Sequence, residues 1–246
     1  MGQFFDDIPP FLPPWLAEQE MFWVATAPLG GGGHVNVSPK GTRGCFHYVS
    51  PTRVWYQDLS GSGNETISHL REPGNGRITI LFSAFQGPPR ITRLFGTGTV
   101  HEYGTPEYDA LIPVSERKPG SRSAIVIDVH KVGTSCGYAV PFYAFQAHRT
   151  KLLDFFDRRE RADRAEGGRS EKGLQAYWAQ KNAESMDGMP GLESAFACER
   201  VPESVFDEAA EGRASDLCAA GSGKAGMVGG ARTGAYAAGN ITACHR

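Results

Sequence analysis

The sequence lacks the marks of a membrane-spanning, secreted or disulfide-linked protein. It contains no run of about 18 apolar residues, so we expect no transmembrane helix. Its opening, MGQFFDDIPP, has neither the basic start nor the apolar core of a secretory signal. The five cysteines are widely spaced without a CxxC pair, which argues against a disulfide framework or a structural zinc site. We therefore expect a cytoplasmic protein with no membrane partner.

The sequence also lacks a large excess of charge of either sign, and it lacks clustered metal ligands. The 25 Lys and Arg residues nearly balance the 27 Asp and Glu residues, which gives a formal net charge of −2. No broad basic surface is therefore available for a nucleic acid. The seven histidines form no HxH or HExxH pattern, so we expect no metal ion. A small molecule is the remaining class of ligand.

What the sequence does contain is a series of short predicted β-strands separated by Gly and Pro. The predicted strands are 21–28, 35–38, 45–49, 53–59, 77–85, 90–103 and 124–132. The predicted helices are 15–20, 64–71, 105–112, 149–166 and 174–182. Short strands with glycine bends favour a closed barrel, because closure removes exposed sheet edges.

The composition changes near residue 192. Beyond that point Gly and Ala become frequent and the apolar periodicity disappears. Such a segment buries too little surface to offset the entropy lost on ordering. We therefore predict one domain at residues 1–192 and a low-complexity, disordered tail at residues 193–246.

Residues 58–66 (DLSGSGNET) connect a predicted strand to a predicted helix. The first N–H groups of a helix have no internal partner and attract phosphate. The glycines allow close approach, and Ser62, Asn64 and Thr66 add side-chain donors. The same pattern also fits an ordinary turn with an Asn or Ser N-cap. It is not a Walker A loop, because no Gly-Lys-Ser/Thr follows.

Polar residues alternate along the strand in the segment HVNVSPKG. Asn36, Ser38 and Lys40 fall on one face, and we expect Val35 and Val37 to point into the core from the other. A polar strip that ends in a lysine suits an anion. A solvated strand face is the alternative.

Two further segments carry polar groups of interest. Arg90 and Arg93 can each bind phosphate through two N–H groups, or can simply be surface arginines. Cys136 and Tyr138 are candidates for a pocket mouth, although a buried structural cysteine is common. Residues 133–137 match GxSxG, but the aromatic segment after them is a poor helix, so a nucleophile elbow is not favoured.

These segments together resemble the pyridoxamine 5′-phosphate oxidase-like, FMN-binding split-barrel family, in a subgroup related to the true oxidases. The resemblance runs from Trp15 to Leu192 and rests on the order of FWVATAPLG, GGHVNVSPKG, VWYQDLSGSGNETISHLRE, GRITILFSAFQGPPRITRLFGTG and SCGYAVPFYAF. It implies a mainly-β (α+β) fold, namely a six-stranded split β-barrel with short peripheral helices and C-terminal helices. It also implies a homodimer with FMN at the subunit interface.

The resemblance implies specific ligand contacts, with Lys40 at the flavin phosphate and Tyr138 near the substrate pocket. The implied cofactor-binding residues are Asn36, Val37, Ser38, Lys40, Ser62, Gly63, Asn64, Thr66 and Arg90. The sequence departs from the true oxidases where their basic pair aligns with Glu65 and Thr66, and where a glutamine aligns with Ile91. Their Arg-x-His substrate signature is also not visible, so pyridoxamine phosphate is not the implied substrate.

Three hypotheses follow from these observations. The first is an FMN-dependent oxidoreductase that acts on a small molecule, in which the flavin carries the electron chemistry. The second is a split-barrel binding module that has lost or exchanged its flavin, for example for haem, or that is not catalytic. The third is a structural dimer without a ligand, which leaves the polar, Gly-bounded segments without a purpose.

Overall fold

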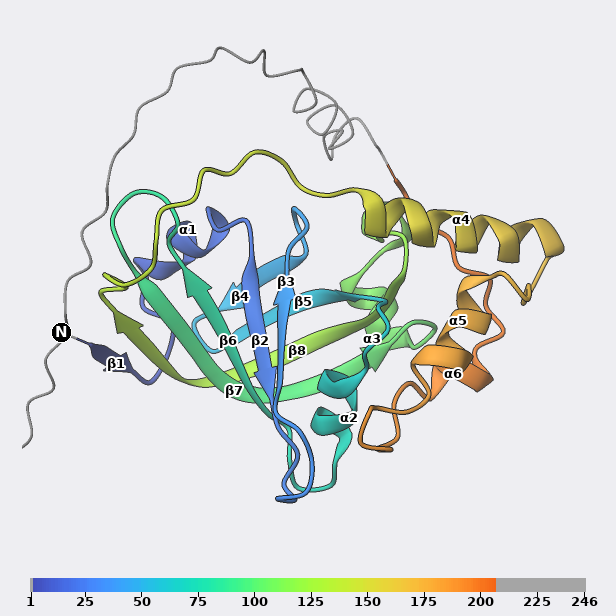
Figure 1. Ribbon diagram of the computed structural model, residues 1–246, viewed down its shortest axis with the longest axis horizontal. Coiled ribbons are helices and arrows are strands. Elements are labelled where there is room, and N and C mark those ends of the chain that lie inside the picture. Colours follow the sequence, from blue (N-terminus) through green and yellow to red (C-terminus); the bar gives the residue numbers. More distant parts are fainter. Residues whose placement is uncertain (1, 207–246) are drawn as a thin grey trace, which may run out of the picture. The chain divides into compact units, whose positions relative to one another are not determined.

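One eight-stranded antiparallel sheet forms the body of the protein, and the computed structural model describes residues 2–206. The strand order is β3-β2-β6-β7-β8-β5-β4, with β1 paired to β8 (Figure 1). The strands are β1 (Gln3–Phe5), β2 (Phe22–Thr26), β3 (Asn36–Lys40), β4 (Phe46–Ser50), β5 (Arg53–Leu59), β6 (Arg77–Ser83), β7 (Ile91–Glu102) and β8 (Ser121–Ser135). The helices are α1 (Leu12–Ala17), α2 (Glu65–Arg71), α3 (Pro106–Leu111), α4 (Lys151–Glu166), α5 (Leu174–Lys181) and α6 (Ser194–Ala197), with a 3₁₀ turn, η1, at Val114–Glu116.

The predicted class, a mainly-β split barrel with short peripheral helices and C-terminal helices, is confirmed. The sheet contains eight strands rather than six, namely the seven predicted from the sequence and the short β1, which pairs with β8. The expected closure is wrong: in the described residues the outermost strands, β3 and β4, do not pair with each other. Edge strand β3 carries Pro39, which lies opposite Trp23 of β2.

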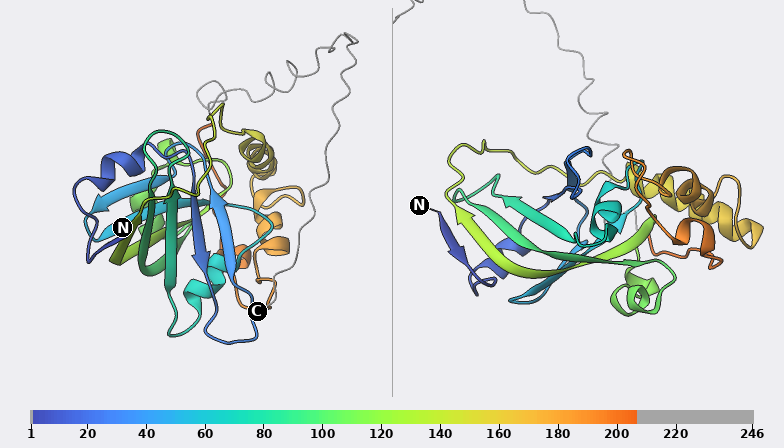
Figure 2. Two further views of the ribbon diagram at one scale, coloured as in Figure 1. Left: turned by 60° about the vertical axis from the view of Figure 1, so that its left-hand side comes forward. Right: turned by 90° about the horizontal axis from the view of Figure 1, so that it is seen from below.

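A β-bulge gives the sheet its curvature. The register between β7 and β8 shifts between Phe95 and Gly96. A Cβ atom on Gly96 would lie 2.5 Å from Cγ2 of Ile127 and 2.6 Å from the carbonyl oxygen of Asp128, so a side chain does not fit there. Bulges bend strands and increase their twist, and Figure 2 shows the strongly curved sheet that results. The glycine bend predicted in this strand is confirmed.

Aromatic side chains connect strands from the two ends of the sheet. Phe22 of β2 lies 5.4 Å, centroid to centroid, from Phe46 of β4 and 5.6 Å from Tyr56 of β5. Phe46 also lies 5.0 Å from Phe82 of β6. Each such aromatic pair contributes about 0.5–1.5 kcal/mol beyond its buried area. The curled sheet is therefore held together across its interior by ring packing, where no hydrogen-bonded ladder connects β3 to β4.

The alternation predicted along β3 is present, but its orientation is reversed. Val35 and Val37, which we expected in the core, are 72% and 62% exposed. Asn36, Ser38 and Lys40 are the half-buried face. The expectation failed because the interior beside this edge strand is lined by polar groups, so the polar face turns inward and the valines face out.

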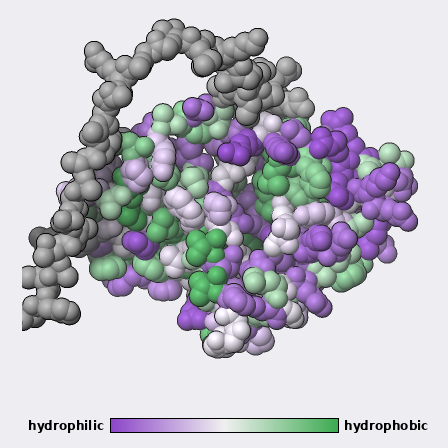
Figure 3. All heavy atoms as spheres, in the orientation of Figure 1, coloured by the Kyte–Doolittle hydropathy of each residue, from purple (hydrophilic) through white to green (hydrophobic). Residues whose placement is uncertain are grey.

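The C-terminal helices are anchored through buried polar contacts. Asp163 of α4 is fully buried and accepts hydrogen bonds from the backbone N–H groups of Leu174 and Gln175 at 2.8 and 3.2 Å. Trp178 of α5 donates from Nε1 to Oγ of Ser60, in the loop after β5, at 2.7 Å. Hydrophilic side chains gather around the C-terminal half of α4 (Figure 3). Within residues 2–206 no helix is long and apolar enough to cross a membrane.

The ordered body continues past the predicted domain boundary. Residues 193–206 contact the barrel, where Glu102 accepts hydrogen bonds from the backbone N–H groups of Glu193 and Ser194 at 2.9 and 2.6 Å. The boundary at residue 192 is therefore too early, because buried acceptors on the barrel hold the segment that follows. The rest of the predicted tail, residues 207–246, lies outside the described residues.

Replacing Trp178 with Phe tests the anchor between α5 and the loop after β5. We expect the free energy of unfolding to fall by about 2 kcal/mol, because the change removes the hydrogen bond to Ser60 and leaves a small cavity. Urea denaturation followed by circular dichroism measures this change. Phe196→Leu is the control, since Phe196 is 67% exposed and should change stability by less than about 0.5 kcal/mol. Equal stability of Trp178→Phe and the wild type would contradict the assignment.

Candidate functional site

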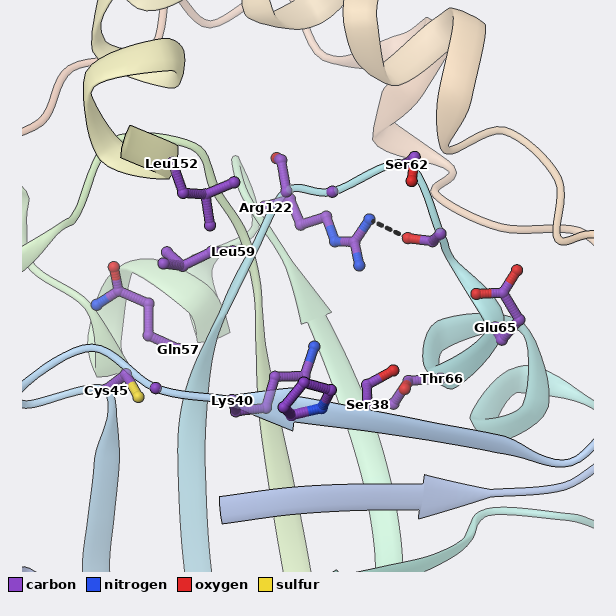
Figure 4. A pocket seen from close by; sticks show the side chains of 15 residues that line it. Ser38, Lys40, Cys45, Gln57, Leu59, Ser62, Glu65, Thr66, Arg122 and Leu152 are labelled. Atoms are coloured by element: carbon purple, nitrogen blue, oxygen red, sulfur yellow. Dashed lines mark hydrogen bonds between the residues drawn. The ribbon is translucent and has the colours of Figure 1, made fainter. Parts of the chain in front are cut away.

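A pocket of about 330 Å³ lies where β3, β5 and β8 meet the loop that precedes α2 (Figure 4). Its size is within the range of small-molecule sites, which starts at about 300 Å³. From the predicted site the pocket contains Ser38, Lys40, Ser62, Gly63 and Thr66. The remaining lining residues are Pro39, Gly41, Cys45, Gln57, Leu59, Ser60, Gly61, Glu65, Arg122 and Leu152.

Asn36 connects strand β3 to the first turn of α2. Its Nδ2 donates to Oγ1 of Thr66 at 3.0 Å and to Oγ1 of Thr26 at 3.3 Å. Its Oδ1 accepts from Oγ of Ser38 at 2.9 Å. Ser38 and Thr66 both line the pocket, so Asn36 holds two pocket hydroxyls at fixed positions. The hydroxyl of Thr26 also contacts Nδ1 of the buried His69 at 2.9 Å, which extends the network into the core.

A fully buried carboxylate connects two cations beside the pocket. Asp58 accepts from Nζ of Lys40 at 2.8 Å through Oδ1 and from Nε of Arg122 at 2.7 Å through Oδ2. The side chains of Asp58, Arg122 and Lys40 are 0%, 4% and 18% exposed. Charges this deeply buried are tolerated when they are paired and hydrogen-bonded. We call these three residues the Asp58 triad.

The triad keeps Asp58 ionised. Burial alone opposes the charge, but the positive charges of Arg122 and Lys40 and their hydrogen bonds outweigh it and lower the pKa of Asp58 to about 2. Because this pKa lies below that of a free aspartate, the triad stabilises the fold fully above about pH 4. That stabilisation is lost as the pH falls from about 4 through 2.

The loop after β5 is fixed by hydrogen bonds to its carbonyl and hydroxyl oxygens. Arg122 donates from Nη1 to the carbonyl of Gly63 at 2.9 Å, and Asn182 donates from Nδ2 to the carbonyl of Gly61 at 2.9 Å. Ser60 donates from Oγ to the carbonyl of Gly120 at 2.6 Å. These contacts come from β8, α5 and the turn before β8, so distant parts of the chain set the shape of the pocket wall.

Glu65 has a structural contact at the position where the resemblance implies a basic residue. Its Oε1 accepts from the backbone N–H of Met186 at 3.3 Å. A Cβ atom on Gly63 would lie 2.5 Å from Oε2 of Glu65, so the glycine lets the carboxylate come this close to the loop. The negative charge therefore stays at the rim of the pocket and holds the segment between α5 and α6.

Five predicted site residues do not line this pocket. Asn36 is hydrogen-bonded to the lining residues Ser38 and Thr66 but does not line the pocket itself. Val37 points outward from the edge strand. Asn64 is 1% exposed and donates to Oγ of Ser68 at 3.2 Å, on the side of α2 away from the pocket lining. Tyr138 is 81% exposed in the segment after β8.

Arg90 is the fifth, and the length of β8 separates it from the pocket. Residue Ile91 pairs with Ser135 at one end of β8, whereas Arg122 lies at the other end, on the order of 40 Å along the strand. The guanidinium of Arg90 instead lies 5.3 Å from the ring centroid of Trp15. Within its own chain, Arg90 therefore has an aromatic partner and not a place in the pocket.

Asp58 and Arg122 are the candidate residues that the sequence analysis missed. Asp58 opened the segment at residues 58–66 but received no role, although aspartate is uncommon within a strand. Arg122 has no local signal, because its partner Asp58 is 64 residues earlier in the sequence. The pairing becomes visible only when β5 and β8 lie side by side.

The pocket is suited to binding an anion and carries no activated thiol. Burial raises the pKa of the Cys45 thiol to about 11, against the opposing charges of Lys118 and Lys40, so the thiol stays neutral. The GxSxG match at residues 133–137 begins inside β8 and forms no strand-to-helix turn. Among residues 2–206 no group of three or more His, Cys, Asp or Glu side chains is placed to hold a metal ion.

Comparison with curated proteins finds a relative over most of the chain. No family model matches the sequence. Over 202 residues, 80% of either chain, the sequence is 40% identical to the pyridoxamine 5′-phosphate oxidase family protein ustO of Aspergillus flavus. Similar solved structures include HupZ of Group A Streptococcus, with a TM-score of 0.41 and 20% identity over 51% of this chain and 91% of that one. An FMN-binding protein of Syntrophomonas wolfei has a TM-score of 0.34 and 11% identity over 48% and 77%.

Replacing Asp58 with Asn tests the role of the triad in stability. At pH 7 we expect a loss of about 3 kcal/mol in the free energy of unfolding, because two buried cations lose their counter-charge. The difference from the wild type should shrink as the pH falls below about 4, where Asp58 itself begins to be protonated. Asp128→Asn is the matched control, since its ion pair with Arg53 is more than half exposed and contributes little. If the difference in free energy of unfolding between Asp58→Asn and the wild type does not change with pH, the stabilising role of the ionised Asp58 is contradicted.

Proposed function

Because the chain belongs to the pyridoxamine 5′-phosphate oxidase family, we propose that it is an FMN-binding oxidoreductase that acts on a small molecule in the cytoplasm. The observation that carries this proposal is the pocket in which Lys40 and Arg122 converge beside the hydroxyls of Ser38, Ser62 and Thr66. Two cations and several hydroxyls are suited to a phosphate and to the polyhydroxyl chain of FMN.

The residues present fit FMN by charge and by their hydrogen-bonding groups. Lys40 would meet the phosphate, and Ser38 would lie along the ribityl chain on the same face of β3. Ser62 and Thr66 add hydroxyl donors from the loop and from α2. When bound, the flavin supplies the transfer of electrons, while the protein binds and orients it. Leu59 and Leu152 give the pocket an apolar wall that limits access of water.

A second candidate function is a split-barrel module that has lost or exchanged its flavin, for example for haem. It is favoured by Glu65, which stands where the resemblance implies a basic residue, and by Ile91, which stands where it implies a glutamine. Under this alternative Lys40 serves only the Asp58 triad. Its replacement would then leave any affinity for flavin unchanged.

We also propose that two copies form a homodimer with the flavin at their interface. Supporting this, the irregular segment after β8 exposes Tyr138, Phe142 and Tyr143 by 81%, 79% and 62%. Contiguous exposed apolar groups are typical of interaction sites. An interface flavin also lets Arg90 and Tyr138 serve the pocket of the partner, although they lie outside their own.

Binding of FMN by the purified protein tests the proposed function. After free FMN is removed, we expect a retained flavin band in the visible spectrum, and Lys40→Ala should weaken FMN binding at least about tenfold through loss of a charged contact. Lys131→Ala is the control, because Lys131 pairs only with the exposed Asp6. If no flavin band is retained, the proposal is contradicted. If Lys40→Ala binds FMN with the same affinity as the wild type, the second candidate function is favoured.

Light scattering tests the homodimer. We expect a particle of twice the 26.6 kDa chain mass, and a shift to the monomer when Tyr138 and Phe142 are both replaced by Ser. The control is Phe196→Ser, which alters another exposed aromatic residue, 67% exposed on α6, outside the segment after β8. A monomeric wild-type protein, or a double variant that stays dimeric, would count against this interface.

A further inference from the structure

The guanidinium of Arg122 is only partly used by the protein. Its Nε donates to Asp58 and its Nη1 donates to the carbonyl of Gly63. These bonds take two of its five N–H groups, and the others have no hydrogen-bond partner in the described part of the chain. Figure 4 shows this guanidinium and the ammonium of Lys40 approaching the pocket from opposite walls.

The Asp58 triad carries an excess positive charge. Asp58 supplies one negative charge to two cations, so the three residues together have a net charge of +1. Glu65 is directed to the backbone N–H of Met186 at the rim and is not paired with either cation. A buried charge without a counter-charge is costly. An anion bound in the pocket would neutralise the excess positive charge of the triad.

We propose that Arg122 binds the phosphate of a phosphomonoester ligand in this pocket, together with Lys40. For FMN as that ligand, the inference rests on the proposed function. Arg122 then supplies, from β8, the positive charge that the α2 segment lacks at Glu65. A guanidinium presents paired donors that match two phosphate oxygens, which an ammonium does not.

The position of Arg122 also couples the ligand to the loop after β5. One edge of the guanidinium holds the carbonyl of Gly63, while the rest faces the pocket. Ser62, next to Gly63, lines the same pocket and adds a hydroxyl. Asp58 fixes the Nε side and thereby acts as a positioning residue. An arginine held at two points loses little further entropy when a phosphate binds.

The test compares FMN with riboflavin, which has the same ring and ribityl chain but no phosphate. Dissociation constants of both are measured by fluorescence for the wild type, Arg122→Gln, Arg122→Lys and Arg53→Gln. In Arg122→Gln we expect FMN affinity to fall about 30-fold and riboflavin affinity to change less than about threefold. In Arg122→Lys we expect FMN affinity to fall about fivefold, because lysine keeps the positive charge but lacks the paired N–H donors of the guanidinium. Arg53, which pairs with the exposed Asp128, is the matched control and should leave both affinities unchanged.

A double variant provides a second test in case Arg122→Gln alone, which leaves Asp58 without one of its two cations, does not fold. Asp58→Asn/Arg122→Gln deletes one charge of either sign, so the net charge of the pocket equals that of the wild type. Loss of the preference for FMN over riboflavin in this variant supports the proposal. If FMN binds and the preference survives in both variants, the proposal is overturned.

Inorganic phosphate separates failure of this inference from failure of the proposed function. If the wild type binds neither flavin, the proposed function fails. Phosphate binding by Arg122 is then tested by comparing the thermal stability of the protein in phosphate and in chloride at equal ionic strength. Stabilisation by phosphate that disappears in Asp58→Asn/Arg122→Gln supports phosphate binding by Arg122. No stabilisation of the wild type, or equal stabilisation of the double variant, overturns it.

Discussion

Asp58 holds together two walls of the pocket that come from distant parts of the sequence. Its two oxygens bind Lys40 on an edge strand and Arg122 at the start of the longest strand. The charge of the carboxylate has no access to water, so these bonds decide whether the site can exist at all. The loop after β5 follows from them, because Arg122 also fixes the carbonyl of Gly63.

Much of the fold was predictable because it depends on local pattern. β5 was predicted with its observed bounds at Arg53–Leu59, and the bend at Gly96 follows from the absence of a side chain. The orientation of β3 was not predictable by the same means. Periodicity places Asn36, Ser38 and Lys40 on one face but does not say which face is inside. That depends on what lines the interior, which is set by other strands.

The site was predicted in part, for a related reason. Lys40, Ser62 and Thr66 meet in one pocket because each belongs to a segment with its own signal. Arg122 has no such signal, since its partner is 64 residues away and only strand pairing brings them together. Arg90 was assigned by order along the chain, yet the length of β8 separates it from the pocket.

The position of Pro39 limits how the protein can associate. β3 is an edge strand of the described sheet, and Pro39 in it has no backbone N–H to donate. A strand from another molecule cannot complete a row of hydrogen bonds along such an edge. Continuous sheets that grow from copy to copy, as in fibrils, are therefore blocked at β3. Copies of this chain that meet at this edge must do so through side chains.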